Sequence, residues 1–204
     1  MRASITTYPT LLEALWPKAG GAAYVRNAAL ALVATLALAV SAKLQIPFWP
    51  VPLTMQTLVI LLVGTAFGWK LGTATVLLYL AEGAIGLPVF AGTPARGIGL
   101  AYMAGPTGGY LVGFLAGAAL CGWLAERGWD RSVWRIAVAM SLGHLLILAL
   151  GWLWLAKLIG PQKAYAAGVA PFYVATVVKT ALAVVLLPLV WRLAPARPTS
   201  NKAG

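Results

Sequence analysis

Six apolar segments follow one another along the chain, and short breaks rich in glycine, proline or charge separate them. The segments cover about residues 26–43, 53–67, 70–87, 107–126, 134–157 and 171–192. A transmembrane helix needs roughly 20 mostly apolar residues, so several segments are short for a span. The pattern predicts an all-α integral membrane protein: a six-transmembrane-helix bundle in one domain, residues 1–204, with a lead-in at 1–25 and a tail at 193–204.

Two breaks are more irregular than the others. The first, residues 45–52, is rich in proline, and the third, residues 86–113, reads GLPVFAGTPARGIGLAYMAGPTGGYLVG. Loops of this length without regular structure are uncommon and usually functional. Non-helical backbone near a bilayer is tolerated only where protein or water satisfies it. We therefore expect the third break to fold over a ligand or another part of the chain.

The composition excludes a soluble protein. Apolar residues make up 61% of the chain and charged residues 9%, and the mean hydropathy is +0.88, which together exceed what a soluble surface allows. The lone Cys121 excludes an internal disulfide and is expected to pack within a membrane helix. The first residues lack the pattern of a signal peptide and are interpreted as a short amphipathic lead-in.

Positive charge is distributed unevenly over the breaks, and cytosolic loops collect Lys and Arg. With both termini in the cytosol, ten of the 15 Lys and Arg residues lie inside, four lie outside and Lys179 lies within a helix. The inner set is Arg2, Lys18, Arg26, Lys70, Arg127, Arg131, Arg135, Arg192, Arg197 and Lys202; the outer set is Lys43, Arg96, Lys157 and Lys163. The first, third and last breaks then share the outer face. The net charge of +11 is mostly this bias and does not indicate a nucleic-acid partner.

Two ionisable residues lie within the predicted helices. Lys179 is eight residues beyond Pro171, about 12 Å below the outer end of its helix. A charge at that depth is costly and usually faces a cavity, a partner or a ligand; the alternative is a lysine that snorkels to the interface or pairs with Glu82. Glu82 itself needs a partner or a proton. It either bridges Lys179 or Arg96 until a ligand carboxylate replaces it, or has a protonated or water-linked structural role.

Other outer-face residues offer further ligand chemistry. Arg96 can fork onto a carboxylate, or it is a solvated loop cation. The turn at Gly108 offers backbone N–H groups to an anion, and Thr107 beside it is an N-cap candidate. Gln56 brings an amide to pocket depth, or it hydrogen-bonds between helices. The aromatic candidates, either pocket walls or an interfacial belt, are Tyr79, Phe90 and Tyr110.

Small residues at four-residue spacing form two ridges on which helices can approach closely. One is Ala31, Thr35 and Ala39 on the first predicted helix; the other is Gly109, Gly113, Gly117, Cys121 and Ala125 on the fourth. Either ridge is compatible with internal packing. We interpret the first as a surface for docking a partner and the second as internal packing.

Three blocks of the sequence, in this order, resemble the BioY family, the substrate-binding S components of energy-coupling-factor (ECF) transporters. They are Ile46-Pro47 with PVPLTMQT at 50–57, Leu78-Tyr79 with GLPVFAG at 86–92, and GPTGGYL at 105–111 followed by Gly113-Phe114. The resemblance implies a six-helix S-component fold in the bacterial cytoplasmic membrane that binds biotin from outside and needs no cofactor. It also implies a transmembrane coupling subunit and two ATPase subunits as partners.

The resemblance also assigns roles to individual residues. Lys179 matches the Lys of the family's sixth-helix motif, and Thr176 stands where that motif has Asp, so a hydrogen bond to the ureido ring of biotin would lack charge assistance. Arg96 loosely resembles the family's loop arginine. Ala31, Thr35 and Ala39 resemble the face that docks the coupling subunit, with Thr in place of the central Ala.

Two other classes of protein are weaker interpretations. The chain has no G-x-x-x-x-G-K-[ST] phosphate loop, paired catalytic carboxylates, metal-ligand cluster or nucleophile with a base, which argues against an enzyme. A stand-alone, proton-coupled transporter of a small carboxylate-bearing vitamin would use Glu82 or His144. No inverted repeat supports it, and His144 alone is more typical of a polar contact between helices.

Overall fold

The computed structural model describes residues 9–17, 22–46 and 49–194 of the chain. Its helices are α1 (Leu11–Leu15), α2 (Ala22–Lys43), α3 (Gln56–Ala84), α4 (Gly99–Met103), α5 (Gly108–Ala125), the 3-10 helix η1 (Trp129–Arg131), α6 (Val133–Ile159), α7 (Pro161–Gly168) and α8 (Phe172–Leu193). The strands β1 (Gln45–Ile46) and β2 (Leu53–Thr54) pair antiparallel. Residues 1–8 and 18–21 of the predicted lead-in and the tail from residue 195 lie outside the described residues.

The helical class is confirmed, and within the described ranges five helices are long and apolar enough to cross a membrane: α2, α3, α5, α6 and α8. The sequence had predicted six shorter segments. The difference lies in α3, which covers the second and third predicted segments without an intervening loop. Two other breaks also contain helices that were not predicted, α4 in the third break and α7 in the last.

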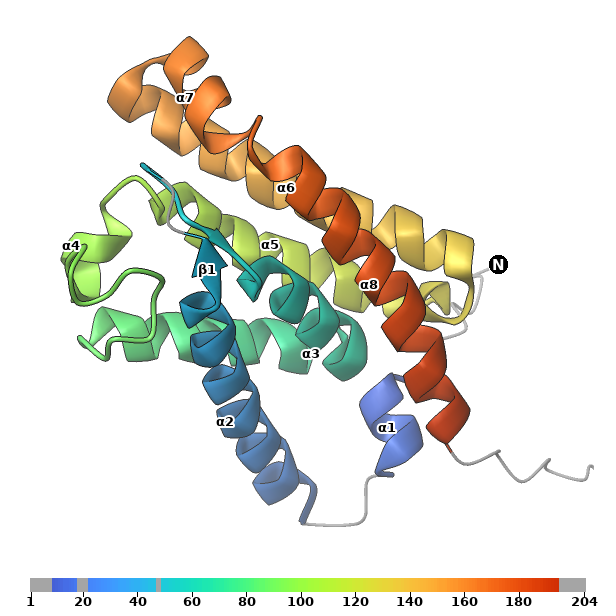
Figure 1. Ribbon diagram of the computed structural model, residues 1–204. Helices are drawn as coiled ribbons and strands as arrows, with labels where there is room; N and C mark the ends of the chain where they lie inside the picture. Colours follow the sequence, from blue (N-terminus) through green and yellow to red (C-terminus); the bar gives the residue numbers. More distant parts are fainter. Residues whose placement is uncertain (1–8, 18–21, 47–48, 195–204) are drawn as a thin grey trace, which may run out of the picture.

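Element α3 folds back on itself at Gly68. This residue has φ 79° and ψ 171°, which are not helical values and which only glycine adopts readily. A Cβ at Gly72 would lie 2.8 Å from the Cα of Gly64, whereas eight residues of straight helix span about 12 Å. The arms 56–67 and 69–84 therefore lie against each other, and Figure 1 shows them meeting at one end of the molecule. Glu126 accepts a hydrogen bond from the Trp69 N–H at 3.2 Å and so caps the second arm.

The centre of the bundle is α5, which packs between α3 and α6. A Cβ at Gly113 would lie 2.8 Å from the Cα of Ile147 on α6, and one at Gly122 would lie within 2.7 Å of the Trp69 backbone. Cys121 is buried, 3.4 Å from the carbonyl of Ala139. The small residues of α5 therefore let two neighbouring helices approach closely, and the prediction of internal packing for this ridge is confirmed.

The ridge on α2 also faces inward, contrary to its interpretation as a free docking surface. Ala31 and Thr35 are only 7% and 2% exposed, Ala39 is half-buried, and the Thr35 hydroxyl donates to Glu82 Oε1 of α3 at 2.9 Å. The outward face of α2 carries large apolar residues, among them Leu32, Val33, Leu36 and Val40. The error arose because close spacing of small residues does not say which neighbour approaches them.

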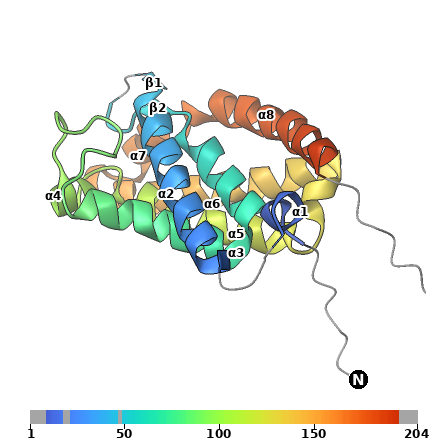
Figure 2. The same ribbon diagram turned by 90° about the horizontal axis from the view of Figure 1, so that it is seen from below.

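The irregular breaks gather at one end of the molecule, as the outer-face prediction required. In Figures 1 and 2 the strand pair, α4 and α7 lie at this end. The Tyr110 hydroxyl donates to the Gly168 carbonyl of α7 at 2.6 Å, and Arg96 donates to the Pro50 carbonyl at 3.2 Å. Contacts between residues from three different breaks therefore close this end over the helices beneath it.

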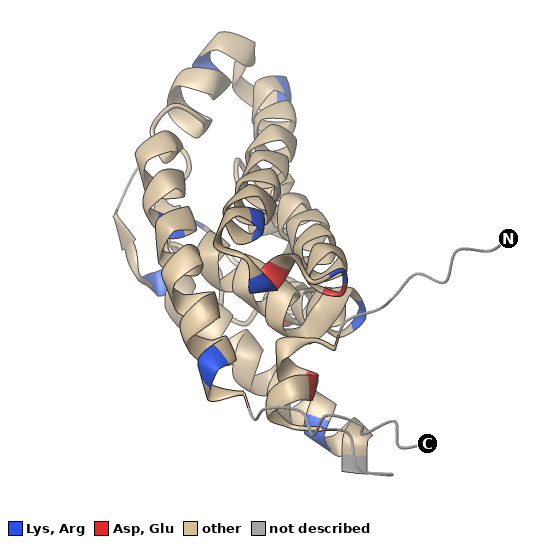
Figure 3. Cartoon of the chain, turned by 90° about the vertical axis from the view of Figure 1, so that its right-hand side faces the viewer, with Lys and Arg blue, Asp and Glu red and all other residues tan. Residues whose placement is uncertain are grey.

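The opposite end carries most of the charged residues of the described chain, and Figure 3 faces it. Asp130 of η1 is buried and accepts from Trp191 Nε1 of α8 at 3.1 Å. Arg131 stacks on the Trp191 ring at 4.6 Å and donates to the Pro9 carbonyl at 3.1 Å. This network ties the lead-in, η1 and α8 together.

Candidate functional site

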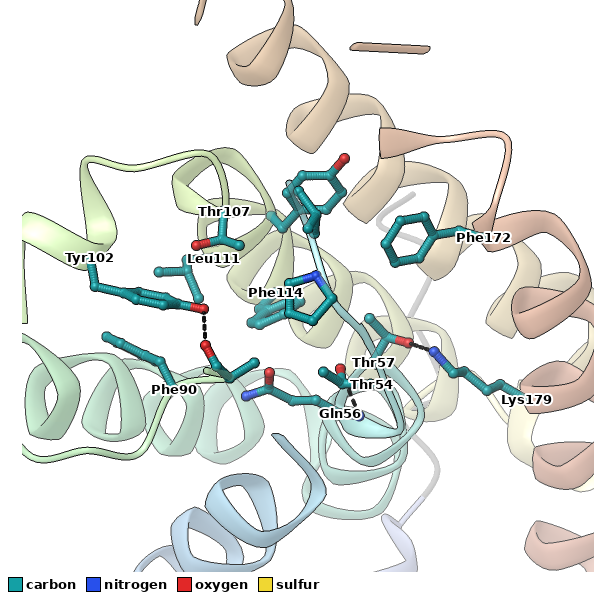
Figure 4. Close-up of a pocket in the computed structure, with 14 residues that line it drawn as sticks. Thr54, Gln56, Thr57, Phe90, Tyr102, Thr107, Leu111, Phe114, Phe172 and Lys179 are labelled. Atoms are coloured by element: carbon teal, nitrogen blue, oxygen red, sulfur yellow. Dashed lines mark hydrogen bonds between the residues drawn. The ribbon is translucent and has the colours of Figure 1, made fainter. Parts of the chain in front are cut away.

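A small pocket lies beneath the irregular end, where α3, α5 and α8 meet the loop between α3 and α5 (Figure 4). Its walls are mostly apolar, and its polar side chains come chiefly from the start of α3 and from α8. The lining residues are Val51, Pro52, Thr54, Gln56, Thr57, Phe90, Ala91, Tyr102, Thr107, Tyr110, Leu111, Phe114, Phe172 and Lys179. Four predicted site residues thus meet here: Gln56, Phe90, Tyr110 and Lys179.

Lys179 supplies the positive charge of the pocket. Its side chain is 4% exposed, and its ammonium donates to the Thr57 hydroxyl at 2.9 Å. This neutral hydroxyl is its one hydrogen-bond partner among the described residues. A buried ammonium without a carboxylate is costly, so the site favours a ligand with an anionic or strongly accepting group.

Glu82 is not part of this pocket, and the predicted bridge to Lys179 is wrong. Its carboxylate accepts from Thr35 of α2, and it does not line the pocket. It lies on the second arm of α3, on the side that faces α2, whereas Lys179 reaches the first arm. The structural alternative for Glu82 describes its position better, as a contact between α2 and α3.

Gln56 and Tyr79 form a hydrogen-bonded chain beside the pocket. Gln56 Nε2 donates to the Tyr79 hydroxyl at 2.6 Å, which donates to the Val89 carbonyl at 2.9 Å. Tyr79 is fully buried and does not line the pocket. It therefore acts on the pocket through Gln56 and through Phe90, whose ring meets it edge-on at 5.5 Å.

The loop over the pocket, residues 86–106, is called the lid below. Within it the Phe90 ring stacks on Tyr102 at 5.0 Å, and the Tyr102 hydroxyl donates to the Ala91 carbonyl at 2.7 Å. A Cβ at Gly83 of α3 would overlap the Phe90 ring. Glycine at this position is therefore what lets the aromatic wall lie directly on the helix.

Two cations fasten the lid, and one was missed as a site residue. Arg96 is exposed and donates to Pro50 between the strands, so it joins the lid to the first break rather than lining the pocket. Lys43, at the end of α2, donates to the carbonyls of Phe90 and Thr93 at 2.9 and 3.0 Å and to the Thr93 hydroxyl at 2.9 Å. The one sequence signal for Lys43 was its position directly before a proline-rich break. Its partners lie 47 and 50 residues further along the chain, so no local pattern indicated the contact.

The predicted anion site at Gly108 is not borne out by the backbone. The Gly108 N–H donates to the Gly105 carbonyl at 3.1 Å, and a Cβ at Gly108 would meet the Met103 carbonyl and the Trp154 ring. Gly108 therefore serves close packing. The neighbouring Thr107 makes no side-chain cap and faces the pocket instead.

Thr176 and His144 lie outside the pocket lining. Thr176 is half-buried, about one turn before Lys179 on α8. His144 is buried on α6, and its Nδ1 lies 2.9 Å from the Met140 carbonyl of the same helix. The histidine thus makes a contact within its helix rather than the expected one between helices.

The sequence was compared with known families. A family model described as "BioY family" matches residues 11–196. The chain belongs to the BioY family. The resemblance drawn from three sequence blocks is therefore confirmed over nearly the whole chain, including the pocket and both ends of the bundle.

Named relatives and one solved structure agree with membership of the BioY family. A "Probable biotin transporter BioY" from Pyrococcus horikoshii is 40% identical over 72% of this chain and 85% of that protein. A "Biotin transporter BioY" from Thermotoga maritima is 37% identical over 74% of this chain and 88% of that protein. The fold is similar to a crystal structure of "the S-component for biotin from an ECF-type ABC transporter", with TM-score 0.71, 24% identity, and coverage of 86% of this chain and 95% of that one.

Proposed function

We propose that this BioY-family chain binds biotin from outside the cell and is the S component of an ECF transporter in the bacterial cytoplasmic membrane. The names of its relatives support biotin as the ligand, and the similar S-component fold supports the class of transporter. Its partners are then a transmembrane coupling subunit and two ATPase subunits, which supply the energy. The chain itself is a binding subunit without an ATP site, a metal or a cofactor.

The observation that carries this proposal is the buried Lys179 among apolar and aromatic walls. Biotin has an apolar bicyclic ring and valerate chain, a carboxylate, and a ureido group that both donates and accepts. Ligand pockets of this kind combine apolar walls with a few placed polar groups. Lys179 offers charge, Gln56 an amide, and Phe90 and Tyr110 aromatic surface.

The remaining candidate residues take supporting roles in this proposal. Tyr79 orients Gln56, and Gly108 lets α5 start close to Trp154. Arg96 lies on the lid, where a ligand carboxylate can replace its contact with Pro50. Thr176 and Glu82 lie beyond the lining, so they contribute only if binding rearranges α8 or α3.

The pocket must enlarge before biotin fits. Its volume is about 40 Å³, enough for one or two water molecules, whereas ligand pockets measure roughly 300–1,000 Å³. The lid carries Phe90 and Tyr102 on one wall, and hydrogen bonds from Lys43 and Arg96 join it to α2 and to the first break. Displacement of the lid would both enlarge this small pocket and let the ligand enter.

The membrane arrangement follows from the same proposal. The two arms of α3 count as separate spans, which gives six, with both termini in the cytosol because ten Lys and Arg residues lie on that side. The lid then faces outward. In this proposal the coupling subunit contacts the outward apolar face of α2, which carries Leu32, Val33, Leu36 and Val40.

Equilibrium binding of labelled biotin to the purified chain in detergent tests the proposal. We expect saturable binding of wild type, weakened binding of Lys179→Ala and Arg96→Ala, and wild-type binding of Lys163→Ala, an exposed lysine on α7 outside the pocket. Absence of saturable binding by the wild-type chain would overturn the assignment of biotin as ligand.

A further inference from the structure

The direction of the hydrogen bonds beside the pocket fixes how the Gln56 amide is turned. The Tyr79 hydroxyl has a single proton, and a backbone carbonyl can only accept, so that proton goes to Val89. Tyr79 can then only accept from Gln56, at 2.6 Å. The amide nitrogen of Gln56 must face Tyr79, and its oxygen must face the other way. The orientation of the Gln56 amide thus follows from which groups have a proton to donate. It does not depend on telling the nitrogen from the oxygen by shape.

The Gln56 oxygen is directed into the pocket. The residue is 3% exposed and lines the cavity, and Figure 4 shows the oxygen on the cavity side. Among the described residues no hydrogen bond involves this oxygen. The oxygen faces the cavity without a donor from the described part of the chain, so it is open to a ligand that brings an N–H or O–H group to this point.

The other polar side chains of the pocket are weaker acceptors than the Gln56 amide. Lys179 only donates, and the remaining polar groups are hydroxyls, of which Thr57 already accepts from Lys179. Thr54 accepts from the Gln56 backbone N–H at 3.3 Å. Gln56 is the one described lining residue with an amide or carboxylate side chain. Since Thr176 provides no carboxylate, the acceptor for a donor group of the ligand falls to Gln56.

We propose that Gln56 Oε1 accepts a hydrogen bond from a ureido N–H of biotin, and that Tyr79 is the positioning residue that holds the amide in this orientation. The proposal rests on biotin being the ligand. Gln56 then selects for a ring with an N–H donor and against a ring of the same shape with an acceptor there. A site built to bond a donor rejects analogues that lack it, because its buried acceptor stays unpaired.

The test compares biotin with its two cyclic carbamate analogues, in each of which a ring oxygen replaces one ureido N–H without added bulk. The dissociation constants for purified wild type, Gln56→Met and Tyr79→Phe give a discrimination ratio for each protein. We expect wild type to bind one analogue at least about 10-fold more weakly than biotin, Gln56→Met to bring that ratio close to 1, and Tyr79→Phe to give an intermediate ratio. Tyr165→Phe, which removes an exposed hydroxyl bonded to Tyr173, is the matched control and keeps the wild-type ratio.

Each result bears on the proposal separately from the choice of biotin as ligand. If Gln56 had only a structural role, Gln56→Met would weaken the binding of all three ligands equally. An unchanged discrimination ratio in Gln56→Met would therefore overturn the proposal. Wild type that binds biotin and both analogues equally would overturn it too, even if the variants do not fold. Tyr79→Phe with the full wild-type ratio would remove the positioning role. Failure of wild type to bind biotin at all would instead reject the proposed function.

Discussion

At the residue scale, the buried ammonium of Lys179 favours ligand binding but lowers the stability of the empty protein. Its ammonium has a neutral hydroxyl as partner, although a buried charge is normally paired with an opposite charge. This buried charge is therefore costly in the empty protein. A bound ligand with an anionic or accepting group offsets this cost. Polar groups at functional sites commonly carry this cost.

The variant Lys179→Met keeps the length of the side chain and removes its charge. We expect its affinity for biotin to fall by about 100-fold or more, and its stability without ligand to rise by about 1 kcal/mol, because no charge is buried. Binding measurements and thermal unfolding in the same detergent check both effects. Lys163→Met, on the exposed part of α7, should change neither, and a loss of stability in Lys179→Met would contradict the argument.

Site residues that stand out by their position along an apolar helix could be predicted from the sequence. Site residues that reach the pocket only through contacts with a distant segment could not. Lys179 stood out because a charge interrupts an apolar helix, and Gln56 because an amide starts one. Thr57 and Phe172 join the pocket through contacts between α3 and α8, which no local pattern encodes. For Glu82 the sequence left a bridge and a structural role open, because its position along α3 does not reveal which side of the helix faces Lys179.

At the element scale, the fastening of the lid to α2 depends on one side chain. Lys43 makes three hydrogen bonds across to the lid, and α2 is otherwise bound to the rest of the chain by its small-residue face. A movement of α2 would therefore act on the lid through Lys43. Because the pocket is small in this structure, we expect release of the lid to control exchange of the ligand.

We expect Lys43→Met to release bound biotin about 5- to 10-fold faster than wild type, since the lid loses the three hydrogen bonds that Lys43 donates. A chase experiment with unlabelled biotin measures the dissociation rate. Lys157→Met, at the end of α6 and outside the pocket, is the matched control. An unchanged dissociation rate in Lys43→Met would show that the lid is held by other contacts.

The helices themselves could be predicted, whereas the way they connect could not. The break at residues 68–70 was read from Gly68, and the structure places a non-helical backbone at that residue. The sequence did not show that the two arms touch there without a loop, because the turn depends on Glu126 capping Trp69 from another helix. Helices α4 and α7 were missed because they are short and lie in glycine- and proline-rich breaks.

At the scale of the whole molecule, the end opposite the pocket contains a buried carboxyl group, that of Asp130. Burial raises the pKa of Asp130 from 3.8 to about 6, against the influence of Arg131 and Trp191. A raised pKa means that the folded state holds a proton more tightly than the unfolded state. This group therefore contributes most stability below about pH 4, and the contribution is lost as the pH rises through 6.

The variant Asp130→Asn should remove that dependence. We expect it to match wild type in thermal stability near pH 4 and to exceed it by about 2–6 °C near pH 7.5, where wild type buries a charge. Unfolding temperatures of both proteins across this pH range give the difference. A difference that stays constant with pH would mean that the carboxyl group does not titrate in the folded protein.

The two ends of the molecule differ in chemistry, and this difference predicts which way it crosses the membrane. The pocket end carries the lid and α7, and the other end (Figure 3) carries most of the Lys and Arg residues that the structure describes, which cytosolic loops collect. The chain contains a single, buried cysteine, Cys121, so Cys121→Ser gives a background for single reporter cysteines. We expect a membrane-impermeant maleimide to label Lys163→Cys on intact cells and Arg127→Cys only after permeabilisation. The reverse pattern would place the pocket in the cytosol, and a binding subunit for uptake from outside would then be ruled out.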